Sequence, residues 1–93
     1  MSVTIHLPGP LRPFASDRSV LTLEGAASVS EALALLPAGV RDRILNERGE
    51  LRPHVNVFVG DTSVRETGGL ATPLANGAKV FVIPAVSGGW SPA

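Results

Sequence analysis

The chain has 93 residues, enough for one small domain, and 44% of them are hydrophobic, enough for a core. Eight acidic and eight basic residues cancel, so the charge favours neither nucleic acid nor an anionic membrane, and the absence of cysteine excludes disulfide bonds, thiolate metal sites and a cysteine nucleophile. No apolar run reaches the roughly 18 residues of a membrane span, and the first six residues lack a signal-peptide pattern, so we expect a cytoplasmic protein with no membrane partner.

Two strands are predicted near the N-terminus. Residues 3–7 alternate apolar and polar side chains, as a half-buried strand does, and Pro8-Gly9-Pro10 ends that strand. Residues 11–17 predict an irregular loop, and residues 19–23 predict a second strand. We expect the two strands to pair as an antiparallel hairpin.

A helix is predicted next. Ser28 and Glu31 have the spacing of a capping box, in which the Ser28 hydroxyl accepts from the Glu31 backbone N–H and the Glu31 carboxylate accepts from the Ser28 N–H. Apolar residues then recur at helical spacing from Val29 to Leu36, and Pro37 ends the helix. Residues 40–45 predict one or two further helical turns.

The second half of the chain predicts three more strands. The clearest covers residues 55–59, where a period of two places the valines on one face and Asn56 and Phe58 on the other. Residues 63–65 predict a short edge strand at best. Asn76-Gly77 is a strong turn signal, and residues 79–84 form the last predicted strand.

This order of elements predicts an α+β fold. Two hairpins flank one helix, which packs on one face of the sheet, while the first and last strands lie side by side at its centre. The arrangement is a ubiquitin-like β-grasp, with a mixed sheet of four to five strands and one main helix. We expect a β-grasp domain over residues 1–87, followed by a flexible tail over residues 88–93 that contains a Gly-Gly pair.

Several segments, found in order along the chain, carry a resemblance to a known family. They are Leu11-Arg12-Pro13, residues 55–59, Val64-Arg65, residues 69–77 and Ile83-Pro84-Ala85-Val86-Ser87-Gly88-Gly89. With them the chain resembles the MoaD/ThiS sulfur-carrier family, and within it the CysO-like branch from actinobacteria.

The resemblance implies a carrier protein that is not itself an enzyme and binds no cofactor. In this family an adenylating enzyme, similar to the ubiquitin-activating kind, uses ATP to join AMP to the carboxylate of the last glycine. A sulfur donor then converts that carboxylate into a thiocarboxylate, which a biosynthetic enzyme accepts. The acceptor pathway stays open between cysteine, molybdopterin and a sulfur-containing natural product. The matching residues here are Gly88 and Gly89, with the sulfur on Gly89.

The chain departs from the family after Gly89, because Trp90-Ser91-Pro92-Ala93 follow. The indole of Trp90 is too bulky for a slot shaped for glycine, and Pro92 stiffens the end of the chain. One explanation is a precursor that a JAMM-type zinc metalloprotease cleaves between Gly89 and Trp90. The alternatives are a remnant of recombinant production and a protein that has lost the carrier role.

A partner-docking patch is predicted on the sheet. Phe58, Phe81 and Ile83 fall on the face opposite the helix if the neighbouring valines face the core. In this family, as in ubiquitin, that face meets the activating enzyme. The alternatives are that loops cover these side chains, or that the register is shifted by one residue and they belong to the core.

Other polar residues give weaker signals. Arg12 and Arg65 are either partners of acidic residues on another protein or solvated surface arginines. His6 and His54 have no acidic or histidine neighbour at metal-ligand spacing, so we expect no metal site. The sequence also offers no convincing set of catalytic residues.

Two functions other than sulfur transfer remain open at this stage. In one, an activated Gly89 joins the lysine of a target protein, so that the chain is a ubiquitin-like modifier. In the other, the chain is a non-covalent interaction module that is never activated.

Overall fold

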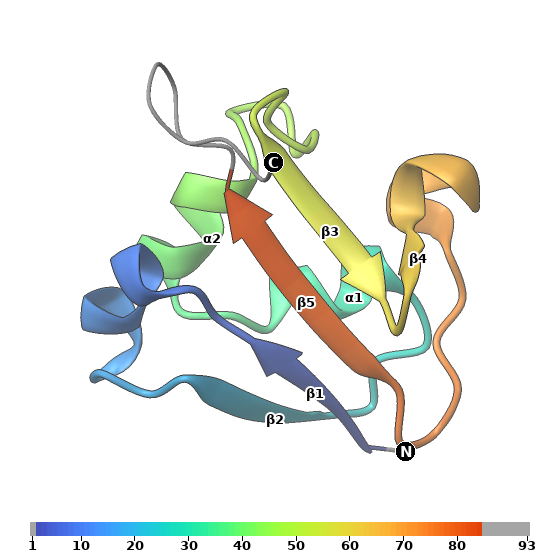
Figure 1. The fold of residues 1–93 in the computed structure, drawn as a ribbon, viewed down its shortest axis with the longest axis horizontal. Helices are drawn as coiled ribbons and strands as arrows, with labels where there is room; N and C mark the ends of the chain where they lie inside the picture. Colours follow the sequence, from blue (N-terminus) through green and yellow to red (C-terminus); the bar gives the residue numbers. More distant parts are fainter. Residues whose placement is uncertain (1, 85–93) are drawn as a thin grey trace.

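The computed structural model describes residues 2–84, which form a five-stranded mixed sheet (Figure 1). The strands are β1 (Ser2–His6), β2 (Val20–Glu24), β3 (Val55–Val59), β4 (Thr62–Ser63) and β5 (Lys79–Pro84). Their order across the sheet is β2-β1-β5-β3-β4. β1 and β5 run parallel, and the other neighbouring pairs are antiparallel. The predicted hairpin and the central pairing of the first and last strands are therefore confirmed.

The helical elements lie on one side of the sheet or around its edges. Two α-helices, α1 (Val29–Ala34) and α2 (Ala38–Ile44), lie behind the sheet in Figure 1. Three 3₁₀ helices complete the fold: η1 (Gly9–Ala15), η2 (Val64–Glu66) and η3 (Gly69–Ala71). This is the predicted α+β architecture.

The predicted helical region is divided at Pro37. α1 ends at Ala34, and Pro37 becomes the residue that precedes α2. Proline disfavours helical geometry in the residue before it and cannot donate a backbone hydrogen bond. The predicted helix end at Pro37 and the predicted helical turns over residues 40–45 are therefore confirmed, but the result is two short helices of similar length and not one main helix.

The capping box forms with one change. The Glu31 backbone N–H donates to the Ser28 hydroxyl at 3.2 Å, as predicted. The Glu31 carboxylate accepts from the backbone N–H of Ala27 at 2.9 Å, one residue before the predicted donor. Both N–H groups precede the first helical turn, so the return bond still satisfies a backbone donor at the helix start.

Two other segments differ from the sequence-based expectation. The predicted loop over residues 11–17 is largely the 3₁₀ helix η1, which buries Leu11 and Ala15 against the core. The predicted edge strand over residues 63–65 is shifted, because β4 ends at Ser63 and η2 begins at Val64. In both segments the burial of apolar side chains favours the observed backbone conformation over the predicted one.

The core lies between the sheet and the helices. On the sheet side it contains Val3, Ile5, Val55, Val57, Val80 and Val82, all at most 3% exposed. On the helix side the largest fully buried side chains are Val29 and Leu33 of α1 and Val40 and Ile44 of α2. The predicted strand register is therefore correct.

Thr72 is a buried polar residue that fixes the segment before β5. Its side chain is 6% exposed, and its hydroxyl lies 2.7 Å from the Gly69 carbonyl oxygen and 3.0 Å from the Thr67 hydroxyl. Its backbone carbonyl accepts from the N–H of Val29 at 3.0 Å, so the segment is tied to the start of α1. These bonds hold η3 against the helix layer.

Replacing Thr72 with valine is expected to lower the free energy of unfolding by about 1–2 kcal/mol. Valine has nearly the shape of threonine but leaves the partners of the hydroxyl without their hydrogen bond. Denaturant-induced unfolding measures the change. The matched control is Thr22→Val on the exposed part of β2, where a change within about 0.5 kcal/mol is expected. Equal stability of the two variants would contradict this role of the hydroxyl.

Candidate functional site

The last strand of the described residues, β5, lies inside the sheet and not at its edge. β5 lies between β1 and β3, with Val80 opposite Ile5 on one side and Val59 on the other. The chain therefore leaves the domain from a central strand that is held on both edges. Gly88, Gly89 and Trp90, the predicted sulfur-carrying and cleavage residues, lie outside the described residues, and their roles stay predictions.

The three residues of the predicted docking patch share the face of the sheet that points away from the helices. Phe58 and Phe81 are direct neighbours across β3 and β5 and are half-buried. Ile83, two residues further along β5, is 41% exposed. The valines between them are buried on the other face, so neither a register shift nor burial in the core removes this patch. Its docking role stays a prediction.

His6 extends the patch onto β1. It lies beside Phe81 in the parallel pairing, and the two rings stack with centroids 4.5 Å apart and an interplanar angle of 23°. His6, Phe81 and Phe58 thus form an aromatic row across three strands. We define the open-face patch as these three residues plus Ile83.

The sequence pattern around His6 bears only on metal binding and does not indicate its place in the patch. The missing information is the exact parallel register of β1 and β5, because His6 and Phe81 come from opposite ends of the chain. The structure places no group of three or more histidine, aspartate or glutamate side chains suited to a metal ion within residues 2–84.

The two arginines considered as partner contacts both bond to the domain itself. The Arg12 guanidinium donates to the Leu7 carbonyl oxygen at 3.3 Å. The Arg65 guanidinium donates to the carbonyl oxygens of Val55 at 2.9 Å and Arg52 at 3.2 Å. Arg65 therefore fixes the segment that leads into β3.

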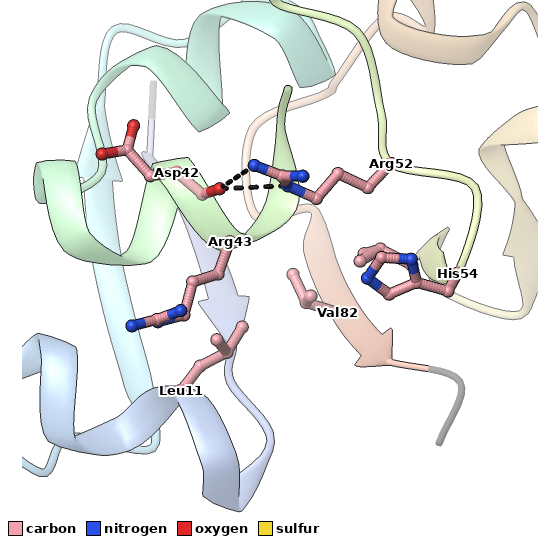
Figure 2. A pocket seen from close by; sticks show the side chains of 7 residues that line it. Leu11, Asp42, Arg43, Arg52, His54 and Val82 are labelled. Atoms are coloured by element: carbon pink, nitrogen blue, oxygen red, sulfur yellow. Dashed lines mark hydrogen bonds between the residues drawn. The ribbon is translucent and has the colours of Figure 1, made fainter. Parts of the chain in front are cut away.

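A pocket of about 400 Å³ lies on the helix side of the sheet, beside the C-terminal half of β5 (Figure 2). It is lined by Leu11, Asp42, Arg43, Arg52, His54, Val55 and Val82. These residues come from η1, α2, the segment before β3, and the two strands β3 and β5. No sequence pattern indicated this pocket, because segments that are far apart in the sequence build it.

With this geometry established, comparison with known proteins assigns the chain to a family. The ThiS family model matches residues 5–89, so the match covers most of the chain and stops at Gly89. The chain belongs to the ThiS family.

The sequence of this ThiS-family chain is similar to a named sulfur carrier. It is 36% identical over 93 residues to the sulfur carrier protein CysO of Mycobacterium tuberculosis, and the match spans 96% of this chain and 100% of the relative. The predicted family and the predicted sulfur-carrier function are thereby confirmed.

Its fold is similar to solved CysO structures. The crystal structure of M. tuberculosis CysO superposes with a TM-score of 0.81 and 30% identity, covering 90% of this chain and 99% of that chain. CysO in the Amycolatopsis orientalis BexX/CysO complex superposes with a TM-score of 0.85 and 31% identity, covering 94% and 99%. The predicted β-grasp fold is confirmed.

The family and the CysO match indicate a carrier and do not favour the modifier alternative. Within residues 2–84, no helix is both long and apolar enough to cross a membrane. The absence of a bound cofactor, the adenylating enzyme and the JAMM-type protease stay predictions.

Proposed function

We propose that this ThiS-family carrier is made as a precursor, is cleaved after Gly89, and then bears sulfur as a thiocarboxylate on that residue. The observation that supports this most directly is the end of the family match at Gly89, which leaves Trp90-Ser91-Pro92-Ala93 outside the family pattern. A JAMM-type zinc metalloprotease is the proposed processing enzyme. The tail is the substrate of all later steps, and the folded domain positions it.

The proposed chemistry proceeds in two steps on the Gly89 carboxylate. In the first, a carboxylate oxygen attacks the α-phosphate of ATP, pyrophosphate leaves, and an acyl adenylate forms. In the second, sulfide attacks the acyl carbon, and AMP leaves with the oxygen that joined it to the carbonyl. The product is a thiocarboxylate, and no oxidant or reductant is consumed. A carboxylate is a poor electrophile, so the adenylate is needed to supply a good leaving group.

Both steps take place in the adenylating enzyme, which must receive the end of the tail. Gly89 follows Pro84 by five positions, and an extended chain over that distance spans about 17 Å. Glycine has no Cβ, so Gly88 and Gly89 give the chain its smallest possible cross-section, which suits a narrow channel. The tail therefore reaches an active site that the folded domain cannot enter.

The open-face patch is the proposed docking surface for that enzyme. It combines aromatic rings with an exposed aliphatic side chain, and interfaces are enriched in such residues at their centre. Phe81 and Ile83 lie on β5, the strand from which the tail leaves. Docking on this face thus brings the tail and the partner together.

A biosynthetic enzyme is the proposed acceptor of the sulfur. The complex of A. orientalis CysO with BexX supports the idea that a carrier of this fold docks on a partner protein. The acceptor pathway is one that forms cysteine, molybdopterin or a sulfur-containing natural product. A thiocarboxylate bound to a protein suits each of them, because it keeps sulfide from diffusing away.

Intact mass spectrometry of the protein isolated from its own cells tests the proposal. The expected species ends at Gly89 and includes a fraction in which one oxygen has been replaced by sulfur. A cellular form that always retains Trp90 and never contains the additional sulfur would overturn the proposal. Conjugates of higher mass, joined through Gly89 to lysines of other proteins, would instead identify a modifier.

A further inference from the structure

The pocket beside β5 has no part in the proposed sulfur chemistry, yet it lies next to the strand from which the tail leaves. Its floor is apolar and consists of Leu11, Val55 and Val82, each at most 6% exposed. Arg43, Arg52 and His54 stand around it (Figure 2). A volume of about 400 Å³ is within the range of pockets that enclose small organic groups.

Hydrogen bonds to the backbone hold the walls of the pocket in place. The Arg52 guanidinium donates through Nε at 3.1 Å and Nη2 at 2.9 Å to the carbonyl oxygen of Asp42, near the end of α2. Arg65 donates to the carbonyl oxygens of Arg52 and Val55, which flank His54 in the sequence. The pocket is therefore preformed, and filling it needs no rearrangement of these walls.

The lining suits a flat aromatic group. An indole buries a large apolar area, which the three apolar floor residues can cover. Guanidinium groups attract the face of an aromatic ring, and tryptophan is the best partner for this contact. Arg43 already makes such a contact within the domain, with its guanidinium carbon 3.9 Å from the centre of the Phe14 ring.

We propose that this pocket binds the indole of Trp90 in the precursor. Trp90 is the only tryptophan of the chain and follows Val82, a floor residue, by eight positions. Six residues lead from Pro84 to Trp90, and an extended segment of that length spans about 20 Å. Val82 lines the pocket only two residues before Pro84, so a segment of this length can turn back to the pocket.

The pocket is a better site for the indole than the open-face patch. Within the described residues the patch is part of a sheet surface, whereas the pocket is an open recess of about 400 Å³ that has two arginines in its lining. Binding in the pocket also leaves the patch free for a partner. If the proposed function holds, cleavage after Gly89 removes Trp90, and with it the contact that holds the tail in the pocket. The Gly89 carboxylate is then free for activation.

Methyl-resolved NMR of the full chain tests the inference without any partner enzyme. Replacing Trp90→Ala is expected to remove ring-current shifts from the methyl groups of Leu11, Val55 and Val82. The wild-type protein is expected to show nuclear Overhauser effects between indole protons and these methyls. Pro92→Ala, which alters the tail but keeps the indole, is the matched control and is expected to leave the pocket shifts in place.

Fluorescence gives a second measurement, because the chain has one tryptophan and no tyrosine. His54→Ala is expected to reduce the ratio of docked to free indole about threefold, the effect of one stacking contact at an exposed site, and so to increase acrylamide quenching. Arg18→Ala, at an exposed arginine outside the pocket lining, is expected to change nothing.

Two results would overturn the inference. One is a Trp90→Ala spectrum in which the pocket methyls do not shift. The other is a set of methyl shifts confined to Ile83, which would place the indole on the open-face patch. Neither result bears on cleavage after Gly89, so the inference and the proposed function fail separately.

Discussion

The 93-residue chain is expected to gain no sulfur when it is incubated with its adenylating enzyme, ATP and sulfide, whereas a chain ending at Gly89 is expected to be converted. In the longer chain Gly89 has no free carboxylate, because its carbonyl carbon is in the peptide bond to Trp90. The indole that follows is also too wide for a channel shaped for glycine. Intact mass spectrometry detects the exchange of one oxygen for one sulfur.

Two control chains separate the effect of the carboxylate from the effect of the tail's shape. Trp90→Gly in the 93-residue chain removes the bulky ring but leaves Gly89 in a peptide bond, so no sulfur is expected. Gly89→Val in the chain ending at residue 89 keeps the carboxylate but adds a branched side chain, so conversion is expected to fall at least about 100-fold, the scale of a misplaced reacting group. Sulfur gained by the 93-residue chain would contradict the requirement for trimming.

Replacing Ile83→Asp is expected to weaken binding to the adenylating enzyme by about 30-fold. An aspartate would place a charge in the open-face patch, and the loss of an apolar anchor of an interface costs about 2 kcal/mol or more. Ile83 is 41% exposed, so the domain itself tolerates the change better than it would at a core position. Calorimetric titration of the chain ending at Gly89 against the enzyme measures the effect.

The matched control for this variant is Leu35→Asp. Leu35 is 51% exposed at the end of α1, on the helix side of the sheet, so the chemical change is similar but the surface is different. Binding by this variant is expected to stay within about twofold of the wild type, as for surface substitutions outside an interface. Equal losses in the two variants would show that the open-face patch is not the docking surface.

Much of the sheet could be predicted because strand periodicity is a local property. The alternation over residues 55–59 placed the valines inward and Phe58 outward, and the structure agrees. The same rule placed Phe81 and Ile83 on the open face of β5. Each side chain's face follows from its neighbours along the strand, so no knowledge of distant segments is needed.

The two segments whose local structure was predicted wrongly, residues 11–17 and 63–65, differ from the prediction for the same reason. Whether residues 11–17 form a loop or a 3₁₀ helix depends on how Leu11 and Ala15 reach the core. Val64 likewise begins η2 and does not continue the strand, because its side chain is buried in the core. The short edge segment does not contain the residues that form this core. Tertiary burial outweighs weak local preferences in short segments.

The sequence by itself determined the order of the strands along the chain and the face of each inward valine. Only the tertiary structure decided that His6 stacks on Phe81 and that Leu11, Arg43, His54 and Val82 meet around one pocket. The strand order and the inward faces depend on residues adjacent in the chain, because alternation along a strand fixes the face of the sheet on which each side chain lies. The stacking and the pocket depend on pairing between distant segments, which is set by the free energy of packing the whole core.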